Sequence, residues 1–296
     1  MKNIVVGLGE ALWDLLPEGK KLGGAPANFA YNVSQLGIES YVVSAVGNDV
    51  LGKEILEVFD SKNMKYIINR VDKKTGSVNV ELDSNGIPSY EIIQDVAWDN
   101  MTLTDEIIEL ASKTTAVCFG SLAQRGAKSR KMINGFIDAM PNNDKVLKIF
   151  DINLRQNYFS KDIVVDSLKR CNVLKINDEE LIVVSHLLGY ITTEPDHVCR
   201  QLIKDYNLKM LILTCGTKGS SIYYDNEISF MDTPKVKVAD TVGAGDSFTA
   251  AFCVSILNGK SIKEAHKNAV QVSAYICTCA GAMPLLPKSF VDAVNN

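Results

Sequence analysis

Short runs rich in β-branched residues alternate along this chain with longer amphipathic stretches. The short runs predict strands over residues 3–8, 40–46, 115–119, 147–151, 172–176, 209–214 and 220–224. The longer stretches predict helices over residues 26–36, 51–61, 104–112, 128–139, 161–169, 178–188, 195–206, 245–258, 261–279 and 288–294. Strands that alternate with helices are typical of a parallel sheet covered on both faces. The pattern therefore predicts an α/β fold.

This alternation of strands and helices is interrupted between residues 65 and 98, which are predicted to form short strands joined by turns. The dipeptide Asn85-Gly86 favours a tight hairpin turn within this segment. Together with residues 11–22, the segment predicts a small antiparallel sheet that projects from the main sheet. Such a lid would exclude water from a phosphate site; the alternative is a plain extension of the sheet. Its exposed edges would also allow two copies to pair as a homodimer.

Composition narrows the class of protein. The chain has 296 residues, of which 46% are hydrophobic and 22% charged, as in a soluble globular protein, and we expect residues 1–296 to form a single domain. A net charge of −4 gives no basic footprint for nucleic acid. No apolar run reaches the roughly 18–20 residues that span a bilayer. Because the N-terminus is predicted to start directly as a strand, we expect no secretory signal and a cytoplasmic location.

Candidate chemistry is most concentrated at residues 240–246, Asp-Thr-Val-Gly-Ala-Gly-Asp, where a loop enters a predicted helix. The small residues Gly243, Ala244 and Gly245 let backbone N–H groups come close to a ligand, and a helix N-terminus favours anions. A carboxylate on the first turn, Asp246, does not suit a site that only holds phosphate. It suits a site where a proton is accepted beside that phosphate. The motif therefore predicts phosphoryl transfer to a hydroxyl.

A second cluster lies near the N-terminus, where Gly23 and Gly24 precede a predicted helix. These glycines let the backbone approach a ligand, and Asn28 offers both a donor and an acceptor. Upstream, Asp14 could accept hydrogen bonds from two sugar hydroxyls. The alternative interpretation of the glycines is a tight turn that caps the helix.

Three further clusters follow predicted strands. Alternation along an extended strand end predicts that Asp151, Asn153 and Arg155 point to the same side, as a site or as a surface salt bridge. Asn177 and Glu180 fit a helix capping box, or they organise magnesium-bound water near a triphosphate. The segment 214–219, Thr-Cys-Gly-Thr-Lys-Gly, forms either a nucleotide-contacting turn or an ordinary β-turn.

Two other glycine motifs do not fit nucleotide binding. The run that begins Gly7-Leu8-Gly9 has Leu12 in place of the third glycine of a dinucleotide fingerprint, and no helix is expected to follow. Residues 47–54 resemble a P-loop, but Glu54 replaces the hydroxyl that would bind magnesium. We interpret the second run as a turn and a helix start, with Asp49 at the helix N-terminus.

Taken together, these segments resemble the ribokinase-like (pfkB) family of carbohydrate kinases over nearly the whole chain, from Gly9 to Pro287. The N-terminal signature is matched by residues 23–28 and 45–52, and the C-terminal signature by residues 240–246. The remaining motifs fall in the order of the family: Asp151-x-Asn153-x-Arg155, Asn177-x-x-Glu180, Thr214-x-Gly216-x-x-Gly219 and Gly281-Ala282-Met283-Pro284. The resemblance implies a three-layer α/β/α ribokinase-like fold with a mostly parallel central sheet and a small β-sheet lid.

The resemblance also implies roles for individual residues. Asp246 would be the general base, and the backbone N–H groups of Gly243, Ala244 and Gly245 would form an anion hole for the transferred phosphoryl group. The sugar would be held by Asp14, Gly24, Asn28 and Arg155. ATP would be contacted by Thr214, Gly216, Gly219 and Asn177, and Glu180 would position Mg²⁺ through water. A monovalent cation such as K⁺ would be held by Asp240 and by backbone carbonyl groups of Val242, Ile276, Cys279 and Gly281.

The runs 9–17 and 22–30 are most similar to bacterial fructokinases, which implies transfer to the primary 6-hydroxyl of D-fructose. Trp13 and Phe29 would then stack on an apolar face of the sugar. Ribose, 2-keto-3-deoxygluconate and aminoimidazole riboside remain alternative acceptors within the same family. A more remote alternative is a sugar-binding protein without catalytic activity, although the catalytic residues expected from the motifs are all present.

Overall fold

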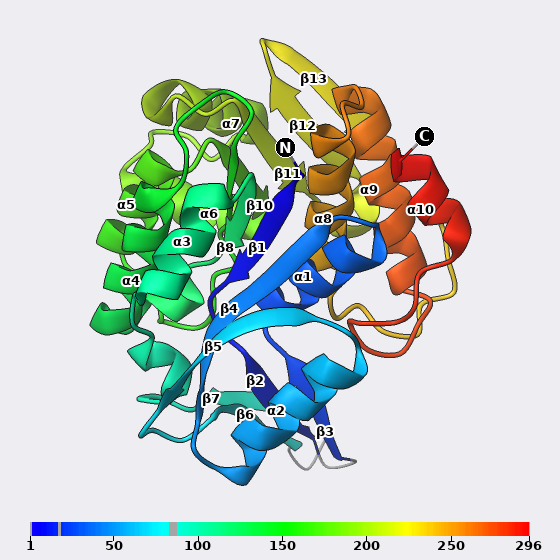
Figure 1. Ribbon diagram of the computed structural model, residues 1–296. Helices are drawn as coiled ribbons and strands as arrows, with labels where there is room; N and C mark the ends of the chain where they lie inside the picture. The colour runs from blue at the N-terminus through cyan, green and yellow to red at the C-terminus, as the bar shows by residue number, and fades with distance from the viewer. Residues whose placement is uncertain (1, 17–18, 83–87, 296) are drawn as a thin grey trace.

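A nine-stranded sheet forms the centre of the computed structural model, which describes residues 2–16, 19–82 and 88–295 (Figure 1). The strand order is β13-β12-β11-β10-β9-β8-β1-β4-β5. All neighbouring pairs from β5 to β11 are parallel, and β12 is antiparallel to both of its neighbours. The strands are β1 Ile4–Leu8, β4 Glu39–Gly47, β5 Lys65–Val71, β8 Ala116–Phe119, β9 Leu147–Asp151, β10 Val173–Asn177, β11 Met210–Thr214, β12 Ser220–Tyr224 and β13 Glu227–Met231.

Helices cover both faces of this sheet, as the alternating sequence pattern predicts (Figure 1). One face carries α3 Asp105–Lys113, α4 Ala127–Ala139, α5 Lys161–Arg170, α6 Asp178–Leu188 and α7 Pro195–Tyr206. The other face carries α1 Ala25–Gln35, α2 Val50–Ser61, α8 Ala244–Leu257, α9 Ile262–Ile276 and α10 Lys288–Asn295. Short 3-10 turns occur at Ala97–Asn100, Leu122–Gln124 and Gly216–Lys218. Among the described residues, none of the helices is both long and apolar enough to cross a lipid bilayer.

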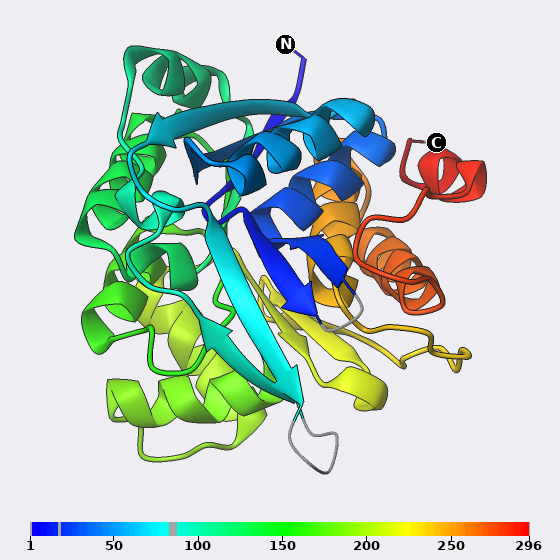
Figure 2. The ribbon, with the colours of Figure 1, turned by 90° about the horizontal axis from the view of Figure 1, so that it is seen from below.

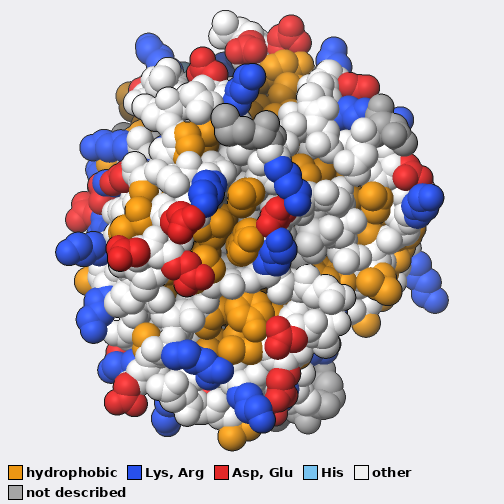
Figure 3. Space-filling view, viewed as in Figure 1, with side chains coloured by type: hydrophobic (Ala, Val, Ile, Leu, Met, Phe, Trp, Pro, Cys, Tyr) orange, Lys and Arg blue, Asp and Glu red, His pale blue; other side chains and the backbone are white. Residues whose placement is uncertain are grey.

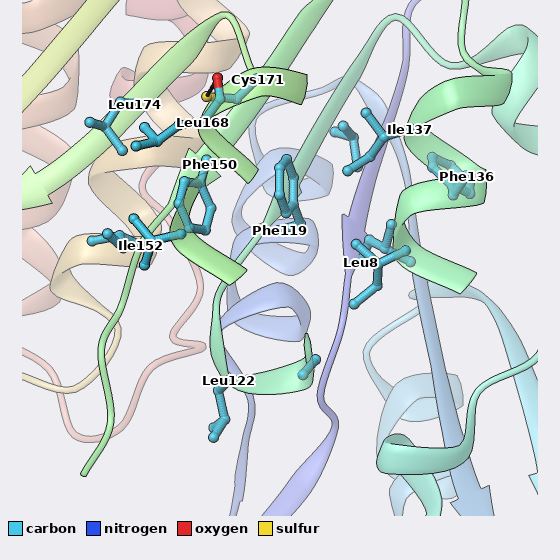
Figure 4. Close-up of a cluster of buried hydrophobic side chains, with 14 of the residues drawn as sticks. Leu8, Phe119, Leu122, Phe136, Ile137, Phe150, Ile152, Leu168, Cys171 and Leu174 are labelled. Carbon is cyan, nitrogen blue, oxygen red and sulfur yellow. Dashed lines mark hydrogen bonds between the residues drawn. The ribbon is translucent and has the colours of Figure 1, made fainter. Parts of the chain in front are cut away.

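The central strands are buried on both faces, because successive side chains of one strand enter opposite hydrophobic layers. In β8, for example, Val117 and Phe119 pack against α3–α5, whereas Ala116 and Cys118 pack against the layer of α8 and α9. Figure 4 shows the first layer, where the rings of Phe119 and Phe150 stack with centroids 5.2 Å apart. These two layers hold the strand ends in fixed positions, and the candidate site lies at those ends.

A second, four-stranded sheet has the order β3-β2-β6-β7 and lies at the lower end of the molecule in Figure 1. Its strands are β2 Leu12–Leu16, β3 Gly19–Gly23, β6 Gly76–Leu82 and β7 Pro88–Ile92, seen from below in Figure 2. The two hairpin pairs are antiparallel, but β2 and β6 are parallel. The sheet is therefore mixed, and not antiparallel throughout as the sequence predicted. The predicted turn at Asn85-Gly86 lies outside the described residues.

The predicted range of the lid, 65–98, was wrong at its beginning. Residues Lys65–Val71 form β5 of the large sheet, where they pair in parallel with Tyr41–Gly47 of β4. The helix α2 lies between these two strands, so that β4, α2 and β5 form one β-α-β unit. The alternation of side chains in Lys65–Val71 fits both an edge strand of a large sheet and a strand of a hairpin. The helix that precedes the segment is the feature that favours the edge strand. The strand β13 was not predicted, because Glu227–Met231 mixes polar and apolar residues.

The surface of the molecule agrees with the small net charge. On the face drawn in Figure 3, Lys and Arg side chains are interspersed with Asp and Glu, and no broad basic area is visible among the described residues.

Candidate active site

One large cavity lies at the carboxyl ends of the parallel strands and is bordered by the small sheet. Its volume of about 1460 Å³ exceeds the range of roughly 300–1,000 Å³ typical of a pocket for one small ligand. Sixteen residues of the predicted site line it: Asp14, Gly24, Asn28, Arg155, Asn177, Glu180, Thr214, Gly216, Gly219, Asp240, Val242, Gly243, Ala244, Gly245, Asp246 and Gly281. Ile276 and Cys279, whose carbonyl groups were suggested for a cation, are not among its lining residues. Residues up to 267 positions apart in the sequence (281 − 14) therefore surround one space with room for two ligands.

Asp246 lies on the first turn of α8, and the N-cap residue of this helix, Gly243, has a left-handed backbone with φ 77°. A Cβ atom on Gly243 would lie 2.5 Å from the Cβ of Ala282, so only glycine fits at this point. The Asn28 side chain donates a hydrogen bond from Nδ2 to Asp246 Oδ2 at 2.8 Å. Burial raises the pKa of Asp246 to about 6, and the nearby Asp151 carboxylate adds to the shift. Asp246 is thus ionised in most molecules at neutral pH, but binds a proton more readily than an ordinary aspartate.

A buried lysine lies beneath the start of α8, and the sequence analysis missed it. Lys175 occupies the middle of β10, and its Nζ atom is 3.0 Å from Asp151 Oδ1. Burial disfavours the ammonium form, but the charges of Asp151 and Glu180 outweigh this, so that the pKa of Lys175 is raised. A Cβ atom on Gly245 would be only 2.9 Å from Nζ. The structure therefore holds a fixed positive charge against the predicted anion hole. A lysine inside the apolar run Val-Leu-Lys-Ile was the signal that could have revealed it.

The prediction that Asp151, Asn153 and Arg155 point to the same side was wrong for Asp151. The strand β9 ends at Asp151, and Asn153 has a left-handed φ of 43°, so the alternation of a strand does not continue to Arg155. Asn153 and Arg155 line the cavity, whereas the Asp151 carboxylate is buried behind it. There it binds Lys175 and accepts a hydrogen bond from Thr249 Oγ1 at 3.2 Å. Asp151 is thus a partner of the buried lysine and is not exposed to a ligand.

Asn177 and Glu180 form the predicted capping box of α6. Glu180 Oε2 accepts the backbone N–H of Asn177 at 3.0 Å, and Glu180 Oε1 accepts the N–H of Leu154 at 2.9 Å. Burial raises the pKa of Glu180. Each oxygen keeps a lone pair for one further donor, such as a metal-bound water. Among the described residues, no group of three or more His, Cys, Asp or Glu side chains could form a metal site by themselves. The donor set suits a magnesium ion carried mainly by phosphate and water.

Asp240 ties two loops together beside the anion hole. Its Oδ1 atom accepts the N–H of Val242 at 3.0 Å, and its Oδ2 atom accepts the N–H of Gly281 at 3.1 Å. Of the carbonyl groups suggested for a cation, that of Ile276 already accepts the N–H of Cys279 at 2.9 Å. Oxygen atoms of a carboxylate and of backbone carbonyls are nonetheless the ligands that hard cations prefer. The residues present are chemically compatible with a monovalent cation.

The segment 214–219 forms a tight turn after β11. The N–H of Cys215 donates to the carbonyl oxygen of Gly219 at 2.9 Å, and Thr233 Oγ1 donates to the carbonyl oxygen of Gly216 at 2.6 Å. Two exposed valines, Val236 and Val238, follow on the same border of the cavity. This border combines backbone polar groups with an apolar surface, as a nucleotide base requires.

A second acidic residue near Asp246 was missed by the sequence analysis. Glu10, in the loop after β1, lines the cavity although only 3% of it is exposed. Burial raises its pKa to about 7, and the charge of Asp246 contributes to the shift. A Cβ atom on Gly24 would lie 2.4 Å from the Glu10 carbonyl oxygen, which explains the need for glycine there. Burial also raises the pKa of Asp14, against the effects of Lys21 and Arg155.

The expectation that Trp13 and Phe29 stack on a ligand was wrong. Trp13 is packed between α1 and α2, and its indole Nε1 donates to the carbonyl oxygen of Leu51 at 3.0 Å. Phe29 is buried in the layer of α8 and α9. Neither ring lines the cavity, because both large apolar side chains are buried in the hydrophobic core.

Comparisons with known proteins match this chain over nearly its whole length. The family model of pfkB carbohydrate kinases matches residues 18–289. A fructokinase of Salmonella typhimurium is 26% identical over 299 residues, which cover 95% of this chain and 95% of that protein. An ATP-dependent 6-phosphofructokinase of Thermoanaerobacterium thermosaccharolyticum is 29% identical over 284 residues, which cover 94% of this chain and 84% of the relative.

A solved structure of a relative has the same fold as this chain. An uncharacterized sugar kinase of Pyrococcus horikoshii, solved in complex with ATP, matches with a TM-score of 0.80 and 27% identity. The match covers 99% of this chain and 100% of that one. The predicted three-layer ribokinase-like fold, with a large mostly parallel sheet and a small second sheet, is therefore confirmed.

Proposed function

This chain belongs to the pfkB family of carbohydrate kinases, enzymes that transfer a phosphoryl group to a sugar hydroxyl, and we propose that it phosphorylates D-fructose with ATP. The product would be fructose 6-phosphate, formed at the primary 6-hydroxyl. The position of Asp246 carries the proposal, because it places a proton acceptor within one helical turn of the small residues Gly243, Ala244 and Gly245. Transfer to a hydroxyl requires these two functions side by side.

In the proposed reaction, Asp246 accepts the proton of the 6-hydroxyl while the hydroxyl oxygen attacks the γ-phosphorus of ATP. A bond forms between this oxygen and the γ-phosphorus, and the bond from the γ-phosphorus to the bridging oxygen of the β-phosphate breaks. The electron pair of the broken bond leaves with ADP. With a pKa of about 6, Asp246 is mostly ionised before the step, and it releases its proton to water after the products leave. The hydrogen bond from Asn28 fixes the orientation of the carboxylate.

Negative charge on the transferred phosphoryl group would be stabilised from two sides. The backbone N–H groups of Gly243, Ala244 and Gly245 supply the anion hole at the start of α8. The ammonium group of Lys175 stands against Gly245 and is held there by Asp151. Its rigid placement means that little reorganisation accompanies the step, which is how preorganised charges accelerate reactions.

The sugar would occupy the end of the cavity formed by Asp14, Gly24, Asn28 and Arg155. Asn28 Oδ1 is buried and has no hydrogen-bond partner among the described residues, so a sugar hydroxyl is a suitable donor. Apolar side chains of the small sheet line the same space: Leu12, Leu16, Val78 and Ile92. We infer that the small sheet acts as the lid that keeps water from the phosphoryl group.

ATP would lie along the opposite border, against Asn177, Thr214, Gly216 and Gly219, with its base beside Val236 and Val238. Glu180 would hold Mg²⁺ through water, and the ion would supply charge neutralisation of the β- and γ-phosphates. Asp240, Val242 and Gly281 would hold K⁺ next to the anion hole. The P. horikoshii relative was solved with ATP, which supports this choice of phosphoryl donor.

A panel of acceptors tests the proposal, with release of ADP as the readout and mass spectrometry to identify the product. The panel contains D-fructose, ribose, 2-keto-3-deoxygluconate and aminoimidazole riboside, together with fructose 6-phosphate because one relative is a 6-phosphofructokinase. The highest kcat/KM is expected for D-fructose. A higher kcat/KM for another acceptor would show that D-fructose is not the preferred substrate, and the assignment as a sugar kinase would stand. Retained sugar binding without ADP formation from any acceptor would support the non-catalytic alternative.

A further inference from the structure

The carboxyl group of Glu10 is a buried acidic group of the described cavity that the proposed reaction leaves without a role. Only 3% of Glu10 is exposed, yet the residue lines the cavity. Its Oε2 atom has no hydrogen-bond partner among the described residues. Buried polar atoms in folded proteins are nearly always paired, so each exception requires an explanation. An explanation by a ligand is natural where the residue borders a binding cavity.

The surroundings of Glu10 indicate which ligand group it meets. Asp246 of α8 and Arg155 of the loop after β9 both act on its charge, and the backbone N–H groups of Glu10 and Ala25 stabilise its ionised form. Ala25 and Asn28 lie three residues apart in the first turns of α1, hence on one face of the helix. Asn28 in turn binds Asp246. Glu10 therefore belongs to the acceptor end of the cavity, beside the proposed base.

A phosphate oxygen is a poor direct partner for the carboxyl group of Glu10. The ionised form of Glu10 repels a phosphate oxygen, because both carry negative charge. A hydroxyl group can instead donate to an ionised carboxylate or accept from a protonated one. Since the pKa of Glu10 is raised to about 7 by burial, both forms are present near neutral pH, and each has a hydroxyl partner available.

We propose that the carboxyl group of Glu10 hydrogen-bonds one hydroxyl of the acceptor sugar, next to the hydroxyl that Asp246 deprotonates. This inference rests on the proposed kinase function and adds a residue that determines which sugars are accepted. A sugar without the matching hydroxyl would leave Glu10 buried and unpaired. Sites of this kind reject the deoxy analogue strongly, because the unpaired polar group remains in the complex.

The alternative role for Glu10 is structural. The N-cap residue of α1, Gly24, has no side chain to cap the helix, and the carboxyl group of Glu10 interacts with the backbone N–H of Ala25 instead. Removing such a cap destabilises the helix whatever the ligand. The two roles differ in one respect: a cap affects all sugars equally, whereas a hydrogen bond to the sugar affects only the analogue that lacks the matching hydroxyl.

A thermodynamic cycle, in which the Glu10 side chain and one sugar hydroxyl are removed singly and together, separates these roles. The variants Glu10→Ala and Glu10→Leu, which both lack a hydrogen-bonding side chain, are compared with the wild type on the best acceptor of the panel and on each of its monodeoxy analogues that keeps the reacting hydroxyl. In the wild type, one analogue is expected to lose about 10-fold to 100-fold in kcat/KM. In Glu10→Ala that same analogue should react as well as the parent sugar, while KM for ATP stays unchanged. Thr104→Ala, which removes the cap of the distant helix α3, should keep the wild-type discrimination.

The remaining outcomes show which statement is wrong. Undiminished discrimination against every analogue in a folded Glu10→Ala variant would show that Glu10 only caps α1. If that variant does not fold, Glu10→Leu keeps more of the side-chain volume without a hydrogen-bonding group, and an unchanged penalty for every analogue overturns the proposal equally. Failure of the wild type to phosphorylate any sugar would overturn the proposed function and this inference with it. If the wild type turns over normally and the Glu10 variants discriminate against the deoxy analogues as the wild type does, the role of Glu10 is wrong and the proposed kinase function stands.

Discussion

Replacing Lys175 by methionine separates its catalytic role from its structural one. The ammonium group is 3.0 Å from Asp151, and 11% and 7% of the two side chains are exposed. Methionine keeps the length of the side chain but leaves the Asp151 carboxylate with Thr249 as its hydrogen-bond partner. Breaking one side of a buried ion pair costs about 3–5 kcal/mol of stability. We therefore expect Lys175→Met to lower the free energy of unfolding in urea by about that amount.

The double variant Lys175→Met/Asp151→Leu removes both charges, and replacing a buried ion pair by apolar side chains is often neutral for stability. Its unfolding free energy should therefore recover most of the loss. Its turnover should not recover, because the positive charge against Gly245 is still missing. Removal of one preorganised group of this kind lowers kcat by about 10²–10³-fold, or roughly 3–4 kcal/mol of transition-state stabilisation. Steady-state ADP release at saturating sugar and ATP provides the measurement.

Recovery of kcat together with stability in the double variant would refute this reasoning. It would mean that Lys175 serves only to neutralise Asp151 during folding, and that the N–H groups of the anion hole are sufficient for the reaction. A loss of kcat in both variants, with stability restored in only one, is the pattern that the structure predicts.

Three other predictions concern the same helix start. Because Asp246 has a pKa of about 6 and acts in its ionised form, kcat/KM for the sugar should be full above that pH and fall as the pH drops through it, in a pH–rate profile. Gly243→Ala forces a side chain into a left-handed backbone against Ala282, which should cost about 1–3 kcal/mol in urea unfolding and sharply lower kcat. Asp240→Asn keeps one acceptor oxygen of two, so it should cost about 1 kcal/mol, keep turnover within about tenfold and abolish any activation by K⁺.

The sequence alone predicted the layers of the fold and the residues that border the cavity. Buried parallel strands appear in the sequence as apolar runs. Gly24 and Gly243 mark positions where other atoms occupy the space that a side chain would need. Polar residues just before a predicted helix located the N-caps at Asp49 and Asn177, because capping depends on neighbouring residues. Local rules therefore sufficed wherever the structure depends on neighbouring residues.

The errors concern long-range contacts. Trp13 and Phe29 lie close in sequence to site residues, but their rings face the core, which depends on how α1 packs against other elements. Lys175 and Asp151 come from two adjacent strands, and only their parallel register places them side by side. The assignment of Lys65–Val71 to the large sheet likewise depends on pairing with β4. Such pairings join segments that lie far apart in the sequence.

The central claim is that Asp246 takes the proton from a sugar hydroxyl. The most direct measurement compares Asp246→Asn with the wild type, using sugar binding by calorimetry and a single turnover with excess enzyme in rapid quench. Asparagine preserves the shape of the side chain and an acceptor for Asn28, but it cannot take a proton. The account predicts nearly unchanged sugar affinity and a phosphoryl-transfer rate lower by about 10²–10⁴-fold. Transfer at close to the wild-type rate in this variant would contradict it.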